Sequence, residues 1–258
     1  MYVTKSAVFL NLTFLLFTAP AVILFGIAKG AAIGSLALIA TPLMLLVMPL
    51  PQALAVLLPI LMVMDWLAFY KYRKNFSKKN LLIMIPSGLA GTIIGFYSFT
   101  LFKEEDLKLI IGIIGLIFTL NYYIKINQEI IKKKTSIFKG SFWSIISGFA
   151  GFCVHSGGTP ISVYLVPLGL EKSVYVGTRI TYFFYLNIFK LMFYIPLGII
   201  NLDNFKTSLM LSPFIPVGIL FGFWIVKNVP QKIYYNIIYA LIFLSSLKLI
   251  AENFNKVF

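Results

Sequence analysis

Long runs of apolar residues follow one another along almost the whole chain, and short polar stretches separate them. Each run has about 20 residues, which is the length that a helix needs to cross a hydrocarbon core of roughly 30 Å. The runs lack the alternation of polar and apolar positions that is typical of a membrane β-barrel. The pattern therefore predicts an all-α polytopic membrane protein. Its candidate spans are residues 8–28, 31–49, 52–70, 81–101, 107–124, 141–168, 175–199, 207–226 and 232–252.

Composition agrees with this fold class. The 258 residues are 60% hydrophobic and 12% charged, and the mean hydropathy is +0.93. We expect a single transmembrane domain over residues 1–258, surrounded by the lipid bilayer. The single cysteine, Cys153, excludes an internal disulfide. The single histidine, His155, has one cysteine, Cys153, and no carboxylate near it in the sequence, which is too few ligands for a metal site, so we expect neither a metal site nor another cofactor.

Positive charge is concentrated in short loops beside the apolar runs. The net charge is +14, but the lysines do not form an interleaved basic and aromatic surface, so we expect no nucleic-acid partner. Residues 71–80 carry five basic residues and no acid, and residues 125–139 carry five lysines and Glu129. The positive-inside rule places both loops in the cytoplasm and the acidic tip at 103–108 outside.

The number of crossings depends on the first two apolar runs. If residues 8–49 form one broken crossing, the chain has eight spans and both termini lie inside. If they form two crossings, the chain has nine spans and the N-terminus lies outside. We prefer about eight transmembrane helices, because residues 141–168 offer a matching broken unit in the second half of the chain.

The two halves of the chain resemble each other. Residues 25–43 are similar to residues 147–168, since each stretch has small residues, a Gly-rich break and an apolar run that ends in Pro-Leu. A second pair, residues 86–96 and 215–223, shares a G-x-x-x-G spacing. This spacing lets helices pack closely in lipid, which can be its whole role. The glycines are Gly91 and Gly95 in the first half and Gly218 and Gly222 in the second.

The offset between the matching segments is roughly 122 to 127 residues. It predicts internal repeat halves over about 8–124 and 139–254. Weak duplication with matched broken segments is typical of transporters, and the broken pair indicates the binding site.

A helix break within the membrane frees peptide N–H groups, which the stretch His-Ser-Gly-Gly-Thr-Pro (155–160) would present. At the start of a new half-helix these groups suit an anion, hydroxyl side chains add donors, and Pro160 fits the first helical turn. The alternative is a kink that neighbouring helices pack. Two breaks at corresponding places favour binding. The candidate substrate-binding residues of the breaks are Ser156, Gly157, Gly158 and Thr159, with Gly34, Ser35 and Thr41 in the first half.

Two cations share one face of the run 175–199. Lys190 lies well inside it, and Arg179 comes eleven residues earlier, which is about 20° from the same helical face. A lysine near the bilayer centre costs roughly 2.5–3.5 kcal/mol and should face a cavity or a partner. We therefore add Arg179, Lys190 and the neighbouring Asn187 to the substrate-binding candidates. Snorkelling of Arg179 to the interface and a buried pair of Lys190 with Asp65 are the alternatives.

Asp65 and His155 are candidates for proton coupling. Asp65 lies about one and a half turns before the first basic loop, and the ordinary pKa of a histidine is near 6.5. The alternatives are a pair of Asp65 with Lys190, Arg179 or a loop lysine, and a neutral, hydrogen-bonded His155.

These stretches resemble the TauE/SafE sulfite exporter family of anion permeases. TPLMLLVMPLPQALAVLLPILMVMDWLAFYKYR (41–73) resembles the family's first-half pattern of a Pro-rich turn, Gln-Ala, an apolar helix with Asp and a basic loop. GTRITYFFYLNIFKLMFYIPLG (177–198) resembles its second-half pattern G-T…N-x-x-K…Y-x-x-x-G. The resemblance covers nearly the whole chain, although GAAIGS (30–35) lacks the Gly-Gly-Gly run of many relatives.

The resemblance implies a permease of the bacterial inner membrane that moves sulfite, a sulfonate or another small anion without ATP. Secondary transport is the preferred mode, and a passive anion channel or an accessory membrane subunit is the alternative. Proton coupling, transport direction and the formation of a homo-oligomer stay open. We expect no enzyme, because Ser156 next to His155 in the sequence does not by itself form a catalytic dyad, and Asp65 is the only acid clearly placed within a span.

Overall fold

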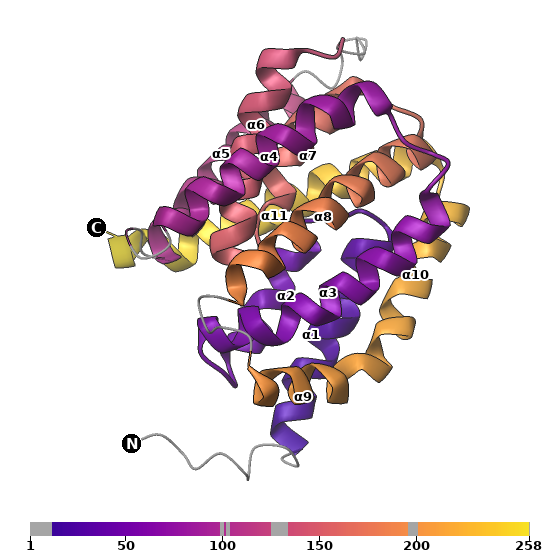
Figure 1. Ribbon diagram of the computed structural model, residues 1–258. Coiled ribbons are helices and arrows are strands. Elements are labelled where there is room, and N and C mark those ends of the chain that lie inside the picture. The colour runs from indigo at the N-terminus through magenta and orange to yellow at the C-terminus, as the bar shows by residue number, and fades with distance from the viewer. Residues whose placement is uncertain (1–11, 99–100, 102–103, 125–133, 196–200, 258) are drawn as a thin grey trace.

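The computed structural model describes residues 12–98, 101, 104–124, 134–195 and 201–257, and every regular element in these ranges is helical (Figure 1). The all-α prediction is confirmed for them. The start of the expected span 8–28, residues 125–133 of the second basic loop and the end of the expected span 175–199 lie outside the described residues. The helices are α1 (Leu12–Gly30), α2 (Leu36–Leu45), α3 (Leu50–Tyr72), α4 (Lys78–Ser98), α5 (Glu104–Ile124), α6 (Ile137–Val154), α7 (Gly158–Leu165) with η2 (Val166–Leu168), α8 (Lys172–Tyr194), α9 (Leu202–Leu211) with η3 (Ser212–Phe214), α10 (Ile215–Asn228) and α11 (Gln231–Val257).

Six helical segments of the described chain are long and apolar enough to cross a membrane. The chain is therefore a multi-pass membrane protein. α8 also has 23 residues, but Lys172, Arg179 and Lys190 lower its hydropathy. The six segments are Leu12–Gly30, Pro51–Tyr72, Lys78–Ser98, Ile137–Val154, Leu202–Asn228 and Gln231–Phe254.

α6 and α7 form a helical hairpin. The Ser147 hydroxyl of α6 donates to the Gly157 carbonyl at 2.7 Å, just before α7 begins. Further along α7, the ring of Tyr164 lies 3.0 Å from the position of a Cβ at Gly140, near the start of α6. The chain therefore turns back beside itself, which differs from the expected single span over residues 141–168.

The same backbone conformation reverses the chain in both hairpins. Ala32 follows α1 and His155 follows α6, and each has a φ of 53°. This left-handed region is costly for a residue with a side chain, and Ala32 and His155 are the only non-glycine residues of the described chain with a positive φ. After its reversal, α2 packs against α1 as α7 packs against α6.

α3 and α8 pack against each other at the centre and run antiparallel. In the middle of both helices, the Asn187 amide donates to the Asp65 carboxylate at 2.5 Å. Just beyond the end of α3, the Ser77 backbone N–H donates to the Thr178 hydroxyl, near the start of α8, at 2.8 Å. The end of one helix therefore lies beside the start of the other.

α5 and α11 form a second antiparallel pair. A Cβ at Gly112 of α5 would lie 3.0 Å from the Leu249 side chain, and the ring of Tyr122 stacks on Tyr239 with the centroids 3.5 Å apart. The start of α5 therefore packs near the end of α11, and the end of α5 packs near its start.

Glycines allow close packing of α1 on α10 and of α4 on α6. A Cβ at Gly26 would lie 2.8 Å from the Cα of Gly218, and a Cβ at Gly91 would lie 2.0 Å from the Ile145 carbonyl oxygen. No side chain fits at such distances without moving a backbone. The predicted packing role of the G-x-x-x-G spacings is confirmed at Gly91 and Gly218.

The end of the bundle that holds the α3–α4 connection is strongly basic. The connections 73–77, 169–171 and 229–230 lie there, and the Lys172 ammonium donates to the Val229 carbonyl at 2.5 Å. The basic residues in and beside these connections are Lys71, Arg73, Lys74, Lys78, Lys79, Lys172, Lys227 and Lys232. This is the end that the positive-inside rule predicts to face the cytoplasm.

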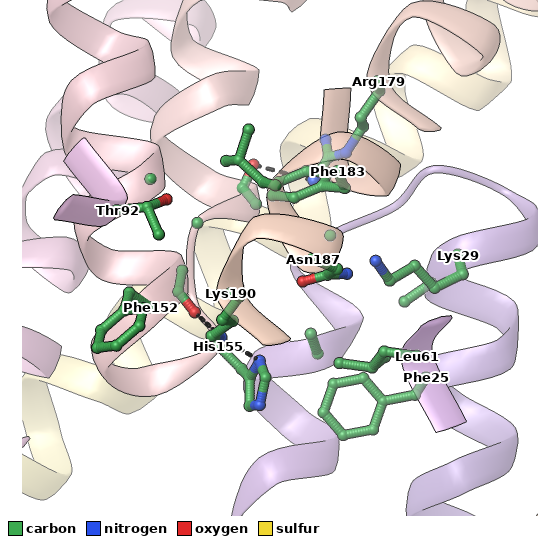
Figure 2. Close-up of a pocket in the computed structure, with 18 residues that line it drawn as sticks. Phe25, Lys29, Leu61, Thr92, Phe152, His155, Arg179, Phe183, Asn187 and Lys190 are labelled. Atoms are coloured by element: carbon green, nitrogen blue, oxygen red, sulfur yellow. Dashed lines mark hydrogen bonds between the residues drawn. The ribbon is translucent and has the colours of Figure 1, made fainter. Parts of the chain in front are cut away.

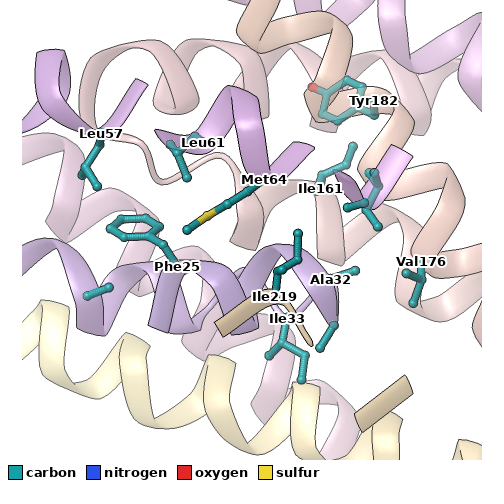
Figure 3. Close-up of a cluster of buried hydrophobic side chains, with 14 of the residues drawn as sticks. Phe25, Ala32, Ile33, Leu57, Leu61, Met64, Ile161, Val176, Tyr182 and Ile219 are labelled. Atoms are coloured by element: carbon teal, nitrogen blue, oxygen red, sulfur yellow. The ribbon is translucent and has the colours of Figure 1, made fainter. Parts of the chain in front are cut away.

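The main hydrophobic core joins the hairpins to the central helices (Figure 3). It contains Phe25 of α1, Leu57 and Met64 of α3, Ile161 of α7 and Ile219 of α10, all almost completely buried. This packing fixes the positions of the two chain reversals relative to α3 and α8.

Candidate functional site

A cavity lies where the two reversals meet (Figure 2). Residues from α1, α2, α3, α4, α6, α7 and α8 line it, together with residues of both reversals. Its volume, counted over the positions open to the centre of a water molecule, is about 70 Å³, which suits one small anion or a few waters. The reversals touch beside it, because a Cβ at Gly158 would lie 2.9 Å from the Cα of Gly34.

Arg179 joins the two reversals. It is 3% exposed, and its guanidinium donates to the Ser162 hydroxyl at 2.6 Å, the Tyr175 hydroxyl at 2.9 Å and the Gly158 carbonyl at 3.0 Å. One guanidinium nitrogen lies 1.7 Å from the position that a Cβ at Gly34 would occupy, so only glycine fits there. Arg179 therefore points into the protein and does not snorkel.

Lys190 also reaches the cavity from α8, and it lies eleven residues after Arg179, nearer the end of this helix. Its ammonium donates to the Gly151 carbonyl and lies 2.9 Å from Nδ1 of His155 (Figure 2). A hydrogen bond at this distance needs one donor and one acceptor, so beside a charged Lys190 the His155 ring is neutral and accepts through Nδ1. The ring of Tyr194 lies 5.2 Å from the ammonium.

Lys29 is the third cation of the cavity, and it has a carboxylate partner. Its ammonium lies 2.7 Å and 2.8 Å from the two oxygens of Asp65, which is 1% exposed. Asp65 also accepts the hydrogen bond from Asn187. Of the partners considered for Asp65, which were Lys190, Arg179 and a loop lysine, the described residues show none, and Lys29 takes this place.

The charges around the cavity do not balance. Three cationic side chains line it, from Lys29, Arg179 and Lys190. Among the described residues only one carboxylate, that of Asp65, pairs with any of them, and its partner is Lys29. Buried cations without a carboxylate are costly, and an anion in the cavity would compensate them. The arrangement can bind a small anion through two ammonium groups, a guanidinium and an amide.

The structure brings together seven of the twelve predicted site residues. They line the cavity with both reversals: Gly34, His155, Gly157, Gly158, Arg179, Asn187 and Lys190.

The other five lie outside the wall. The Ser156 and Thr41 hydroxyls donate to carbonyls of their own segments, at 3.1 Å and 2.9 Å, and Asp65 lies behind Lys29 and Asn187. Ser35 and Thr159 are also buried, and the described residues offer their hydroxyls no hydrogen-bond partner.

Sequence reasoning left several wall residues out of the predicted site. Lys29 was recognisable as a cation next to the first break, but its partner Asp65 is 36 residues away. Phe25, Phe152 and Phe183 give the wall apolar surface, and aromatic residues are too common in membrane helices to single out. Among the described residues, no three or more histidine, cysteine or acidic side chains form a group that could hold a metal ion.

Comparison with known proteins gives one match. A family model described as sulfite exporter TauE/SafE matches residues 18–249, nearly the whole chain. No curated protein and no solved structure matches it.

Proposed function

Because the chain belongs to the sulfite exporter TauE/SafE family, we propose that it is a secondary transporter, which moves a small sulfur-containing or organic anion, such as sulfite or a sulfonate, across the bacterial inner membrane. The observation that carries this proposal is the cavity between the two reversals, where cations outnumber carboxylates. Arg179 and Lys190 would supply the charge that attracts the anion, and backbone groups near Gly157 and Gly158 would approach it closely.

The proposal includes an internal duplication, with halves over about 8–124 and 139–254. α3 and α8 each have 23 residues and start 122 residues apart, which makes Asp65 and Asn187 equivalent positions. The two left-handed residues are 123 apart. Each half would consist of a hairpin and three crossings. In support, the packing of α1 on α10 corresponds to that of α6 on α4.

The halves would be inverted relative to each other in the membrane. Equivalent helices run antiparallel in both central pairs, α3 with α8 and α5 with α11, and a two-fold axis that relates such helices lies in the membrane plane. α3, α4, α5, α8, α9 with α10, and α11 would then cross the membrane, and the hairpins would enter from opposite faces. This topology replaces the eight spans expected from hydropathy, and α1 would begin and α11 would end outside.

An inverted pair of hairpins fits a carrier that opens to each side in turn. The cavity lies on the proposed axis, because its wall holds equivalent residues from the two halves. The pairs are Ala28 with Gly151, Lys29 with Phe152, Gly34 with Gly157, and Leu61 with Phe183. A substrate at such an axis can be released to either side when the halves exchange their conformations.

The proposal is tested by sulfite flux into proteoliposomes that contain the purified protein, the Lys190→Ala variant or the Lys248→Ala variant. Lys248 pairs with Glu252 at 3.7 Å on α11 and lies outside the cavity, so it is a matched control. We expect saturable flux that Lys190→Ala lowers at least tenfold and Lys248→Ala leaves unchanged. Flux that does not saturate would indicate a passive channel. Folded wild-type protein without sulfite flux would exclude sulfite as the substrate, and sulfonates and carboxylates would be tested next.

A further inference from the structure

Asp65 lies behind two donors that face the cavity. Lys29 and Asn187 belong to the cavity wall, and both donate to Asp65. The Lys29 ammonium has three N–H groups and the Asn187 amide has two, so each keeps a donor for a molecule in the cavity. An anion there and the Asp65 carboxylate would compete for the same positive charge.

We propose that Asp65 is the proton acceptor of this transporter and takes up one proton for each anion that binds in the cavity. The inference rests on the proposed anion transport and names its co-substrate. The proton comes from hydronium or the buffer acid of the surrounding solution, which is left as water or the buffer base, and it forms an O–H bond on the carboxyl group while Lys29 turns its charge to the anion. When the anion leaves, Lys29 pairs with Asp65 again and the proton is released, so proton and anion move in the same direction.

Burial makes this exchange sensitive to the anion. Asp65 is 1% exposed, so its negative charge depends on the neighbouring cation and amide and not on water. Lys29 faces it from α1 and Asn187 from α8, and Arg179 and Lys190 of α8 line the same cavity. A second negative charge beside Lys29 removes part of this support and favours the neutral carboxyl.

His155 is the rival proton acceptor and is less suited to the role. Its Nδ1 lies 2.9 Å from the Lys190 ammonium and, beside a charged Lys190, accepts a hydrogen bond from it. A proton on that nitrogen would break the bond and place two cations side by side. A proton on Asp65 removes a charge, and the carboxyl group keeps an oxygen that can accept from Asn187.

The test measures proton uptake when thiosulfate, which holds no proton near neutral pH, is added to the purified protein in weakly buffered detergent solution. Affinity is measured by calorimetry at several pH values. We expect about one proton per thiosulfate and an affinity that falls about tenfold per pH unit where Asp65 is ionised in the empty protein. Asp65→Asn should bind thiosulfate without proton uptake. Asp203→Asn, at the start of α9 and outside the cavity, is the matched control and should retain the uptake.

Two outcomes would overturn the inference. The first is proton uptake that persists in Asp65→Asn, and if this uptake disappears in His155→Gln, His155 is the acceptor instead. The second is a wild-type affinity that does not change with pH, which decides the question even if Asp65→Asn does not fold. Wild-type protein that binds neither thiosulfate nor methanesulfonate would remove the proposed function as well, so the two failures are distinguishable.

Discussion

The hairpins α1–α2 and α6–α7 reverse with the same backbone conformation but carry different chemistry. Ala32 and His155 have the same φ of 53°. In the first hairpin, Lys29 is neutralised by Asp65. In the second, Lys190 lies within hydrogen-bond distance of the His155 ring, and no carboxylate of the described residues pairs with it. The two reversals therefore share a φ value but not an arrangement of charges, and under the proposed function the unbalanced charge is what an anion would recognise.

The central helices show the same contrast. Arg179 and Lys190 of α8 correspond, at the offset of 122 residues, to Leu57 and Ala68 of α3, which are completely buried. The apolar positions of α3 maintain the packing, while Arg179 and Lys190 place two cations on α8, and the third cation of the cavity, Lys29, comes from α1. The scaffold and the site are thus specified by different residues, and each can be tested without the other.

The contact between the two reversals should be the most sensitive point. Gly158→Ala places a Cβ 2.9 Å from the Cα of Gly34 and 2.7 Å from the Arg179 guanidinium, so the reversals must separate. We expect a loss of about 1–3 kcal/mol in the free energy of unfolding and at least a tenfold loss of transport. Thermal unfolding in detergent and flux in proteoliposomes measure the two effects.

Gly151→Ala is the matched control for stability. A Cβ there would lie 3.8 Å from its nearest neighbour, which is ordinary contact, and the equivalent position in the first half is already Ala28. The melting temperature should therefore change little. If Gly151→Ala and Gly158→Ala destabilise the protein equally, the reversals do not touch as described.

Much of this arrangement follows from local sequence. The Gly-rich break at 155–160 and the first break near Gly34 were predicted from glycine-rich stretches that disfavour one continuous helix, and the α8 cations from their helical spacing. The return of α7 beside α6 was not predicted, because hydropathy does not say in which direction a chain continues after a break. The pair of Lys29 with Asp65 was not predicted either, because it depends on the packing of α1 against α3.

Glycine at the two left-handed residues should change the free energy of unfolding by less than Gly158→Ala does, and with opposite signs at the two positions. Ala32→Gly removes the cost of a left-handed alanine, which is about 1 kcal/mol, and should raise the free energy of unfolding by about 0.5–1 kcal/mol. His155→Gly relieves the same strain but loses the hydrogen bond to Lys190, so its net effect should be a loss. Unfolding of both variants in detergent decides this. A stabilised His155→Gly would mean that the side chain contributes nothing and that the hairpins differ less than described.

The smallest difference in stability between the two hairpins should come from the residue that precedes each central helix, α8 or α3. Glu171 caps the start of α8 by accepting from the Ser173 N–H at 3.2 Å, whereas Pro49, the equivalent residue before α3, makes no side-chain cap. Hydrogen bonds from Ser173 hold the pKa of Glu171 below its ordinary value. A carboxylate with a lowered pKa stabilises the folded state above its unfolded pKa of about 4.3, and this stability is lost as the pH falls through the folded pKa.

Glu171→Gln should therefore cost a few tenths of a kcal/mol near neutral pH, a small value because the carboxylate is exposed and water screens it. The difference from the wild type should shrink as the pH falls below the unfolded pKa of about 4.3 and disappear once the pH has passed the lower folded pKa of Glu171. Melting temperatures of both proteins between pH 3 and pH 7 measure it. A difference that stays constant over this range would mean that the cap acts through shape and not through charge, and the second hairpin would then join its helix as neutrally as the first.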